Sequence, residues 1–273
     1  MRANQPPHER SLTPRDVITV AELATRLDKR LYTRGATEAG VHDGCVAALR
    51  QGVAAVITLP EHLEVASAVL DGSAVGLATA VGWHRRDEER LQAGEVVAEA
   101  QDLMGRGATE VAYIATAARL EPDDGQQVAD HVAELVETAT AGGVRVRTIL
   151  ATDDLTDEQI RRTCRDVAAA GAWMVQGGSW RARRAGLSRV EVIRAALPPE
   201  VLVKWTEPVG AVSKLLLCIS LGVDRFNGDV DQLLSDASRA ERLAPLTIPA
   251  AGVDYLPAVE RRPVVTRLPP EAF

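Results

Sequence analysis

Short apolar runs rich in β-branched residues alternate along the chain with longer stretches of helical period. Eight runs have the length and composition of buried strands. They are LDKRLY (27–32), VAAVITL (53–59), VGLATAV (75–81), EVAYIAT (110–116), VRVRTIL (144–150), AWMVQGG (172–178), VLVKWTE (201–207) and VDRFNG (223–228). Helical patterns lie between them, including residues 88–107, 126–143 and 156–171. Several of these patterns end in a glycine just before the next run, which is typical of a left-handed helix C-cap.

This alternation predicts right-handed βαβ units and a parallel sheet. About eight such units favour closure into a single (β/α)₈ TIM barrel, an α/β fold that typically uses about 250 residues. The alternative is an open doubly wound sheet, but no GxGxxG motif opens a helix here. We expect a polar N-terminal arm (1–20), the barrel (21–245) and a proline-rich C-terminal tail (246–273). The tail either wraps the domain or a neighbouring subunit, or is disordered.

Composition narrows the class of protein. The 273 residues include 31 basic and 38 acidic side chains, a net charge of -7, so nucleic acid is not an expected partner. No run reaches the roughly 18 apolar residues of a membrane span, and the polar N-terminus lacks the apolar core of a signal peptide. We therefore expect a cytoplasmic protein with no membrane partner. Cys45, Cys164 and Cys218 fall in helical patterns and are expected in the core, and neither a metal site nor a cofactor is expected.

The candidate site follows from the barrel geometry, because chemistry in this fold lies at the carboxyl ends of the strands. Side chains alternate between the inside and the outside along each strand. The polar residues late in the strands, or directly after them, are Arg147, Gln176, Lys204, Thr206, Glu207, Asn227 and Asp229. Thr206 and Asn227 are expected to contact the substrate.

Four tryptophans lie near strand ends. Trp83 and Trp180 follow strands, where they either form a pocket wall for a flat or apolar substrate or pack within their loops. By alternation, Trp173 and Trp205 should face outward, between strand and helix. His84 is expected either to act as an acid or base at the mouth or to be a solvated loop residue. The basic runs 84–86 and 181–186 suggest an anionic substrate, with solvated loops as the alternative.

Several segments, in order along the chain, resemble the deoxyribose-phosphate aldolase family. LDKRLYTRGAT is similar to the family's LDHTLLKPxAT, GATEVAY to GADEVDM, ILATDDLTDE to ILETGLLTDE, AGAWMVQGGSW to AGADFVKTSTG, and VLVKWTEPVG to VGVKASGGIR. The resemblance runs from about Leu27 to Gly228. It implies the same barrel, a homodimer, and aldol chemistry through a lysine imine assisted by a second lysine and an aspartate.

The resemblance also shows where this chain departs from the family. The imine-forming lysine falls on Gln176, which cannot form an imine, and the aspartate falls on Ala112. The second lysine is retained as Lys204, and a fifth-strand lysine becomes Arg147.

The family's glycine-rich phosphate-binding turns are changed as well, and read TEPVG and RFNGD here. The proline has no N–H to donate, and Glu207 and Asp229 add negative charge. A phosphorylated substrate is therefore disfavoured.

Two classes of function remain open. The first is a divergent aldolase-type enzyme of specialised metabolism. It performs an aldol, retro-aldol, cyclisation or other carbon–carbon lyase step on a larger, non-phosphorylated, anionic carbonyl compound. In one form Lys204 is the imine former or general base, Gln176 orients the carbonyl, Glu207 or a water moves protons, and Arg147 holds a carboxylate. In another form Gln176, Arg147 and Lys204 polarise the substrate without covalent catalysis.

The second class is a non-catalytic barrel that binds a metabolite or a partner enzyme. In that case Lys204 and Arg147 pair with Asp28 and Glu207 in a structural charge network.

Overall fold

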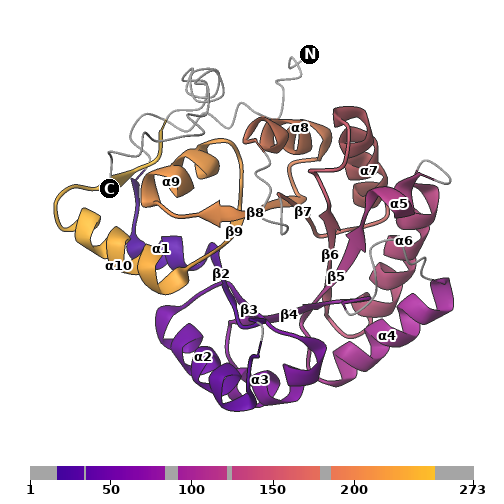
Figure 1. Ribbon diagram of the computed structural model, residues 1–273, viewed down its shortest axis with the longest axis horizontal. Coiled ribbons are helices and arrows are strands. Elements are labelled where there is room, and N and C mark those ends of the chain that lie inside the picture. The colour runs from indigo at the N-terminus through magenta and orange to yellow at the C-terminus, as the bar shows by residue number, and fades with distance from the viewer. Residues whose placement is uncertain (1–16, 34, 84–91, 122–124, 179–185, 250–273) are drawn as a thin grey trace, which may run out of the picture.

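A computed structural model gives the fold of residues 17–249, apart from 34, 84–91, 122–124 and 179–185. Eight parallel strands form a closed barrel with helices around it (Figure 1). The strands are β2 (Leu27–Arg30), β3 (Ala55–Ile57), β4 (Gly76–Ala80), β5 (Glu110–Ala115), β6 (Arg145–Leu150), β7 (Met174–Gly177), β8 (Leu202–Val209) and β9 (Arg225–Gly228). Each strand pairs with the next along the chain, and β9 closes on β2. The predicted TIM barrel is confirmed.

The helices occupy the connections between these strands and flank the barrel at both ends of the chain. They are α1 (Val20–Ala24), α2 (Glu38–Gln51), the 3₁₀ turn η1 (Pro60–His62), α3 (Leu63–Leu70), α4 (Ala93–Gly105), α5 (Ala117–Leu120), α6 (Gln126–Thr140), α7 (Asp157–Ala169), α8 (Ser188–Ala196), α9 (Val212–Ser220) and α10 (Val230–Glu241). None of the helices in the described ranges is long and apolar enough to cross a membrane.

Local sequence signals set the helix ends. The Thr156 side chain accepts from the backbone of Gln159, whose own side chain accepts from Thr156, so α7 begins in a capping box. Gly52, with φ 64°, ends α2 in the left-handed region, where an L side chain is disfavoured. The predicted glycine stop before β3 is confirmed.

A small antiparallel pair lies outside the barrel. β1 (Val17–Ile18) pairs with β10 (Leu246–Thr247), so part of the predicted arm meets the start of the predicted tail. Residues 250–273, the rest of that tail, lie outside the described residues. The division into arm, barrel and tail stays a prediction.

The main apolar core fills the layer between strands and helices. Trp205 is fully buried there, as expected, and so are Cys45, Cys164 and Cys218. Trp173 differs from the prediction. It directly precedes β7, and its ring lies 4.3 Å from the guanidinium carbon of Arg145 and 5.6 Å from that of Arg225. Stacking on these cations at the amino-terminal end of the strands replaces the outward, apolar packing that simple alternation predicts.

Candidate functional site

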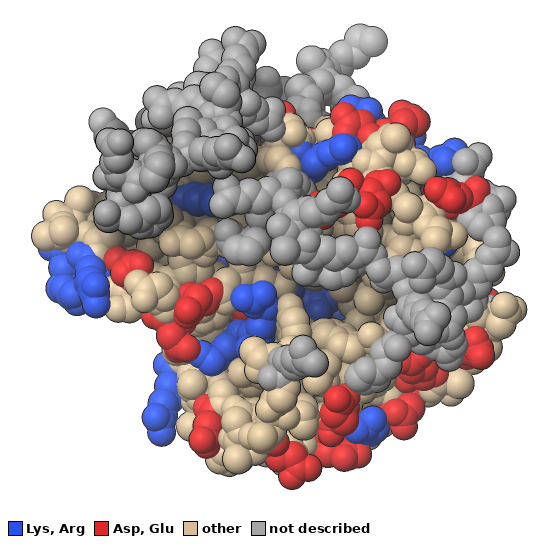
Figure 2. Space-filling view, in the orientation of Figure 1, with Lys and Arg blue, Asp and Glu red and all other residues tan. Residues whose placement is uncertain are grey.

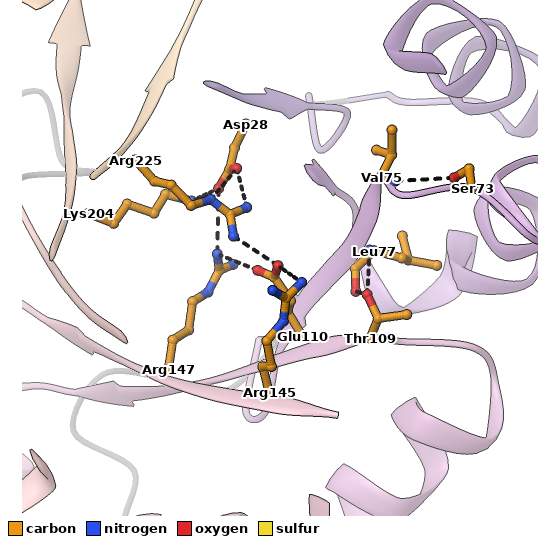
Figure 3. A network of polar contacts seen from close by, with 10 residues as sticks. All are labelled: Asp28, Ser73, Val75, Leu77, Thr109, Glu110, Arg145, Arg147, Lys204 and Arg225. Atoms are coloured by element: carbon orange, nitrogen blue, oxygen red, sulfur yellow. Dashed lines mark hydrogen bonds and ion pairs between the residues drawn. The ribbon is translucent and has the colours of Figure 1, made fainter. Parts of the chain in front are cut away.

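A buried charge network lies in the barrel interior, towards the amino-terminal ends of the strands. Its members are Asp28 on β2, Glu110 on β5, Arg147 on β6, Lys204 on β8 and Arg225 on β9 (Figure 3). None of the five side chains exceeds 7 % exposure. They come from strands far apart in the sequence, and they meet because each has the inward-facing parity of its strand.

Asp28 is the centre of this network. It accepts a hydrogen bond from Nζ of Lys204, and Nε of Arg225 donates to its Oδ1 at 2.9 Å. Burial by itself raises the pKa of the Asp28 carboxyl, but the charges of Lys204, Arg225 and Arg147 outweigh burial and hold that pKa below its usual value. Asp28 therefore stays ionised at neutral pH.

Glu110 is the second acid of the network. Nη1 of Arg225 donates to its Oε1 at 2.8 Å, and Nη2 of Arg145 donates to the same oxygen at 2.9 Å. The neighbouring strand leaves room for this carboxylate, because Gly76 approaches so closely that a Cβ there would lie 2.8 Å from Oε1. Arg145 is 46% exposed, so it joins the network from its edge.

The charges of the buried network cancel when Lys204 is left out. Asp28 and Glu110 carry two negative charges, and Arg147 and Arg225 carry two positive ones. Burial, and then the positive charge of Arg147, lower the pKa of Lys204 to about 7, although Asp28 acts in the opposite direction. Asp28 and Lys204 can both have a lowered pKa. When the amine of Lys204 is neutral, Arg147 and Arg225 still keep the Asp28 carboxylate ionised.

A cavity of about 220 Å³ lies in the barrel interior next to this network. It is lined by Tyr32, Ile57, Gly82, Trp83, Ile114, Arg119, Arg147, Ile149, Gln176, Thr206 and Asn227. In the space-filling view, basic atoms are visible inside a hollow near the centre of the face (Figure 2). Arg147 belongs to both the cavity wall and the charge network, whereas Lys204 is not among the lining residues.

Four of the lining side chains are buried and bring polar atoms to the cavity. No hydrogen bond within the described structure reaches Nε or Nη1 of Arg147, Oε1 of Gln176, Oγ1 of Thr206 or Oδ1 of Asn227. Arg147 is held only by ion pairs, with its Nη1 3.7 Å from Oδ2 of Asp28 and 3.7 Å from Oε2 of Glu110. Buried polar groups are rarely left unsatisfied, so this set is suited to a polar ligand.

An acidic side chain occupies the helix N-terminus that follows β9. Asp229 caps α10, and its Oδ1 accepts from the backbone N–H of Gln232 at 3.1 Å. A carboxylate already occupies this helix N-terminus, which is a common phosphate-binding position in proteins.

The structure brings together most of the side chains expected at the site. Arg147, Gln176, Thr206, Asn227 and Trp83 all line the one cavity described above. Lys204 points inward from β8, but it is fully buried and its Nζ donates a hydrogen bond to Asp28. The side chain of Glu207, together with His84 and Trp180, lies outside the described residues. The predicted pairing of Lys204 and Arg147 with Asp28 is present, and its predicted extension to Glu207 stays untested.

Sequence analysis did not single out several residues of this region. Glu110 and Arg225 are the first residues of β5 and β9, and attention to the carboxyl ends of the strands passes over them. Strand parity gives the missing signal, because Glu110 shares the parity of Ala112 and Arg225 that of Asn227. The cavity residues Tyr32, Ile57, Ile114, Arg119 and Ile149 were also missed, and four of these five carry apolar or aromatic side chains that resemble core residues in a sequence.

Comparison with known proteins identifies the family. No family model matches the chain. A curated deoxyribose-phosphate aldolase from Desulfitobacterium hafniense is 26% identical over 208 residues, which are 75% of this chain and 93% of that protein. Another from Thermoanaerobacter pseudethanolicus is 30% identical over 158 residues, 56% of this chain and 68% of that protein. The chain belongs to the deoxyribose-phosphate aldolase family.

The fold of this deoxyribose-phosphate aldolase family member agrees with solved structures. The tetrameric deoxyribose phosphate aldolase from Aeropyrum pernix matches with a TM-score of 0.70 and 21% identity, covering 83% of this chain and 94% of that one. This likeness shows the shared barrel. Family membership supports an aldolase-type lyase as the general class.

Proposed function

We propose that this member of the deoxyribose-phosphate aldolase family is an aldolase-type lyase that polarises a carbonyl compound without forming an imine. Its substrate carries a carboxylate and no phosphate. The observation that carries the proposal is a set of four buried polar side chains that line one cavity and each have a polar atom without a hydrogen bond in the described structure. Preorganised groups of this kind stabilise developing charge at little reorganisation cost.

Arg147 is proposed to bind the carboxylate. It is 2% exposed, lines the cavity and makes only loose ion pairs with Asp28 and Glu110. Burial lowers its pKa, yet a guanidinium remains charged in proteins at neutral pH. A substrate carboxylate would offer Arg147 the close hydrogen bonds that the two network acids, at 3.7 Å, do not.

Gln176, Thr206 and Asn227 are proposed to orient the carbonyl. In a retro-aldol step a base removes the hydroxyl proton, the carbon–carbon bond breaks, and its electron pair moves onto the carbonyl to give an enolate. The hydroxyl of Thr206 and the amide N–H groups of Gln176 and Asn227 can donate to that oxygen as its charge develops. The unpartnered amide oxygens of Gln176 and Asn227 can accept from the substrate hydroxyl. Glu207 or a water is proposed to carry the proton, as the sequence suggests.

Lys204 is proposed to act as a positioning residue. It is fully buried, donates to Asp28 and lies off the cavity wall, so its amine would have to leave its partner to attack a substrate carbonyl. The imine mechanism at Lys204 is therefore the less supported of the two forms, even though its pKa of about 7 suits a nucleophile.

The absence of a phosphate group in the substrate is supported by Asp229. Its carboxylate caps α10, so a phosphate dianion there would meet a like charge at a site whose amide is already used. The cavity does not test the prediction of a larger substrate, because residues 84–91 and 179–185, which follow β4 and β7, lie outside the described residues. Specialised metabolism, a homodimer and a cytoplasmic location remain predictions.

Turnover measurements on a panel of hydroxy-carbonyl compounds, each with and without a carboxylate, test the proposal. We expect cleavage of at least one carboxylate-bearing compound, and loss of most kcat/KM in Arg147→Met with partial recovery in Arg147→Lys. Arg239→Ala is the control, because that arginine is exposed on α10. If no carboxylate-bearing compound binds or reacts, and a partner protein co-purifies in fixed stoichiometry, the non-catalytic alternative replaces this proposal.

A further inference from the structure

The cavity wall is divided between two halves of the barrel. Strands β6 to β9 contribute the polar set of Arg147, Gln176, Thr206 and Asn227, together with Ile149. The half that contains β2 to β5 contributes Tyr32, Ile57, Gly82, Trp83 and Ile114. Arg119 also lines this second half, but its Nη1 donates to the backbone oxygen of Ile114 at 2.6 Å. One side of the cavity is therefore polar and cationic, and the other is largely apolar apart from the guanidinium of Arg119.

Two aromatic rings form part of the apolar half. The rings of Tyr32 and Trp83 meet edge to face, with their centroids 5.1 Å apart and an interplanar angle of 68°. Each ring restrains the other, because such pairs favour this geometry over a free orientation. Trp83 therefore offers a ring surface to the cavity that its neighbour holds in place.

A small apolar cluster supports this aromatic wall. Trp83 and Ile114 pack against a cluster of Ala80, Ala112 and Ile149 that is separate from the main core. Ala80 on β4 and Ala112 on β5 are direct partners in the register of the sheet. The small alanine side chains let Trp83 and Ile114 pack close to the strands.

The polar groups lie at two levels of the barrel. Ile149 pairs in register with Gln176, and Arg147 precedes Ile149 by two residues on the same strand. The backbone of Arg147 is therefore roughly 7 Å deeper along the strand direction than that of Gln176. Trp83 follows β4, three residues beyond its last residue, Ala80. A ligand that spans these groups places its anionic end deep and its apolar end towards the strand ends.

We infer that the ligand is an aryl-substituted oxo acid, a carboxylate and a carbonyl group joined to one aromatic ring. This inference rests on the proposed function and specifies the fragment that leaves as the enolate in the retro-aldol step and that the reverse aldol step consumes. The carboxylate contacts Arg147, the carbonyl lies at the level of Gln176, and the ring packs against Trp83 and Tyr32. The cavity volume of about 220 Å³ exceeds the roughly 150 Å³ of an engineered cavity that binds benzene, so it has room for a single ring and a short chain.

Calorimetric titration of the full-length protein with three probes tests the inference. Phenylpyruvate has the ring, carbonyl and carboxylate, pyruvate lacks the ring, and phenylacetaldehyde lacks the carboxylate. We expect phenylpyruvate to bind at least tenfold more tightly than pyruvate. In Trp83→Leu this ratio should fall towards one, and Trp83→Phe should restore most of it. Arg147→Met should weaken both acids far more than it weakens the aldehyde.

The outcomes separate the two proposals. If pyruvate binds as tightly as phenylpyruvate, or if Trp83→Leu leaves the ratio unchanged while its melting temperature shows an intact fold, the aromatic assignment is overturned and the carboxylate site stands. If phenylacetaldehyde binds and neither acid does, the proposed function is overturned, and this inference with it. If none of the three probes binds, both are overturned.

Discussion

Gln176 on β7 and Lys204 on β8 are direct partners in the register of the barrel, yet only Gln176 lines the cavity. Lys204 is fully buried and donates to Asp28. The barrel interior is thus divided into a layer that lines the cavity and a layer of internal ion pairs. Arg147 belongs to both layers, because it lines the cavity and pairs with Asp28 and Glu110.

Removal of the central acid should strongly destabilise the barrel. Asp28→Ala leaves Lys204 and Arg225 without their shared acceptor. Removal of one partner of a buried ion pair lowers the free energy of unfolding by about 3–5 kcal/mol. Urea denaturation measures the free energy of unfolding. The matched control is Glu64→Ala, whose 69% exposed carboxylate pairs with Arg106 and whose loss should cost no more than about 1 kcal/mol. An equal loss of unfolding free energy in the two variants would contradict the claim that the network stabilises the barrel.

Stability should rise with pH between the folded and unfolded pKa values of Lys204. These are about 7 in the folded protein and 10.5 as the ordinary value. Between them the unfolded chain binds a proton that the folded protein does not, so the free energy of unfolding increases by up to about 1.4 kcal/mol per pH unit. Below pH 7 both states are protonated, and the folded state carries the full cost of the buried charge. Lys204→Met should remove this slope from the difference between the two proteins. An identical slope in wild type and Lys204→Met would show that Lys204 has an ordinary pKa.

A lysine introduced at Gln176 should form an imine. In Gln176→Lys the amine replaces a 5% exposed side chain on the cavity wall, beside the positive charge of Arg147. Burial and that charge both lower the pKa of an amine and leave part of it neutral at pH 7. Borohydride reduction with a bound aldehyde, followed by intact mass and peptide mapping, should find the adduct at position 176. Absence of an adduct, despite a retained fold and measurable aldehyde binding, would show that position 176 does not face the ligand.

The close approach of β4 to Glu110 should make Gly76 sensitive to substitution. In Gly76→Ala the new Cβ would lie 2.8 Å from Oε1 of Glu110 and 3.3 Å from Cβ of Ala55, so the network must shift. Overpacking of this kind typically costs about 1–3 kcal/mol. Gly94→Ala is the control, because a Cβ there meets nothing within 4 Å on α4, where alanine is the better helix former. Thermal unfolding should show a lower Tm for Gly76→Ala only.

The barrel could be predicted from sequence because its elements follow from local patterns. Each of the eight β-branched runs overlaps a barrel strand, and Gly52 ends α2 where the pattern predicts a stop. The polar half of the cavity was also predictable, since Arg147, Gln176, Thr206 and Asn227 have the inward parity of their strands. These expectations rest on short-range periodicity, which a single sequence retains.

Contacts between distant strands were harder to predict. Arg225 contacts Asp28 across 197 residues and Glu110 across 115, and the sequence does not specify which acid each cation meets. The stacking of Trp173 on Arg145 differs from the expected outward packing, because cations at the amino-terminal end of the barrel offer the ring a closer partner. Apolar cavity residues such as Ile57 and Ile114 have the same sequence signature as core residues.

Reductive trapping of the wild-type protein tests the central claim most directly. The protein is saturated with a carbonyl ligand whose binding calorimetry has established, treated with borohydride and analysed by intact mass, with Gln176→Lys as the positive control. We predict no mass increase in the wild type, because Lys204 donates to Asp28 and does not line the cavity. An adduct mapped to Lys204 would contradict the account and assign the imine chemistry to that residue.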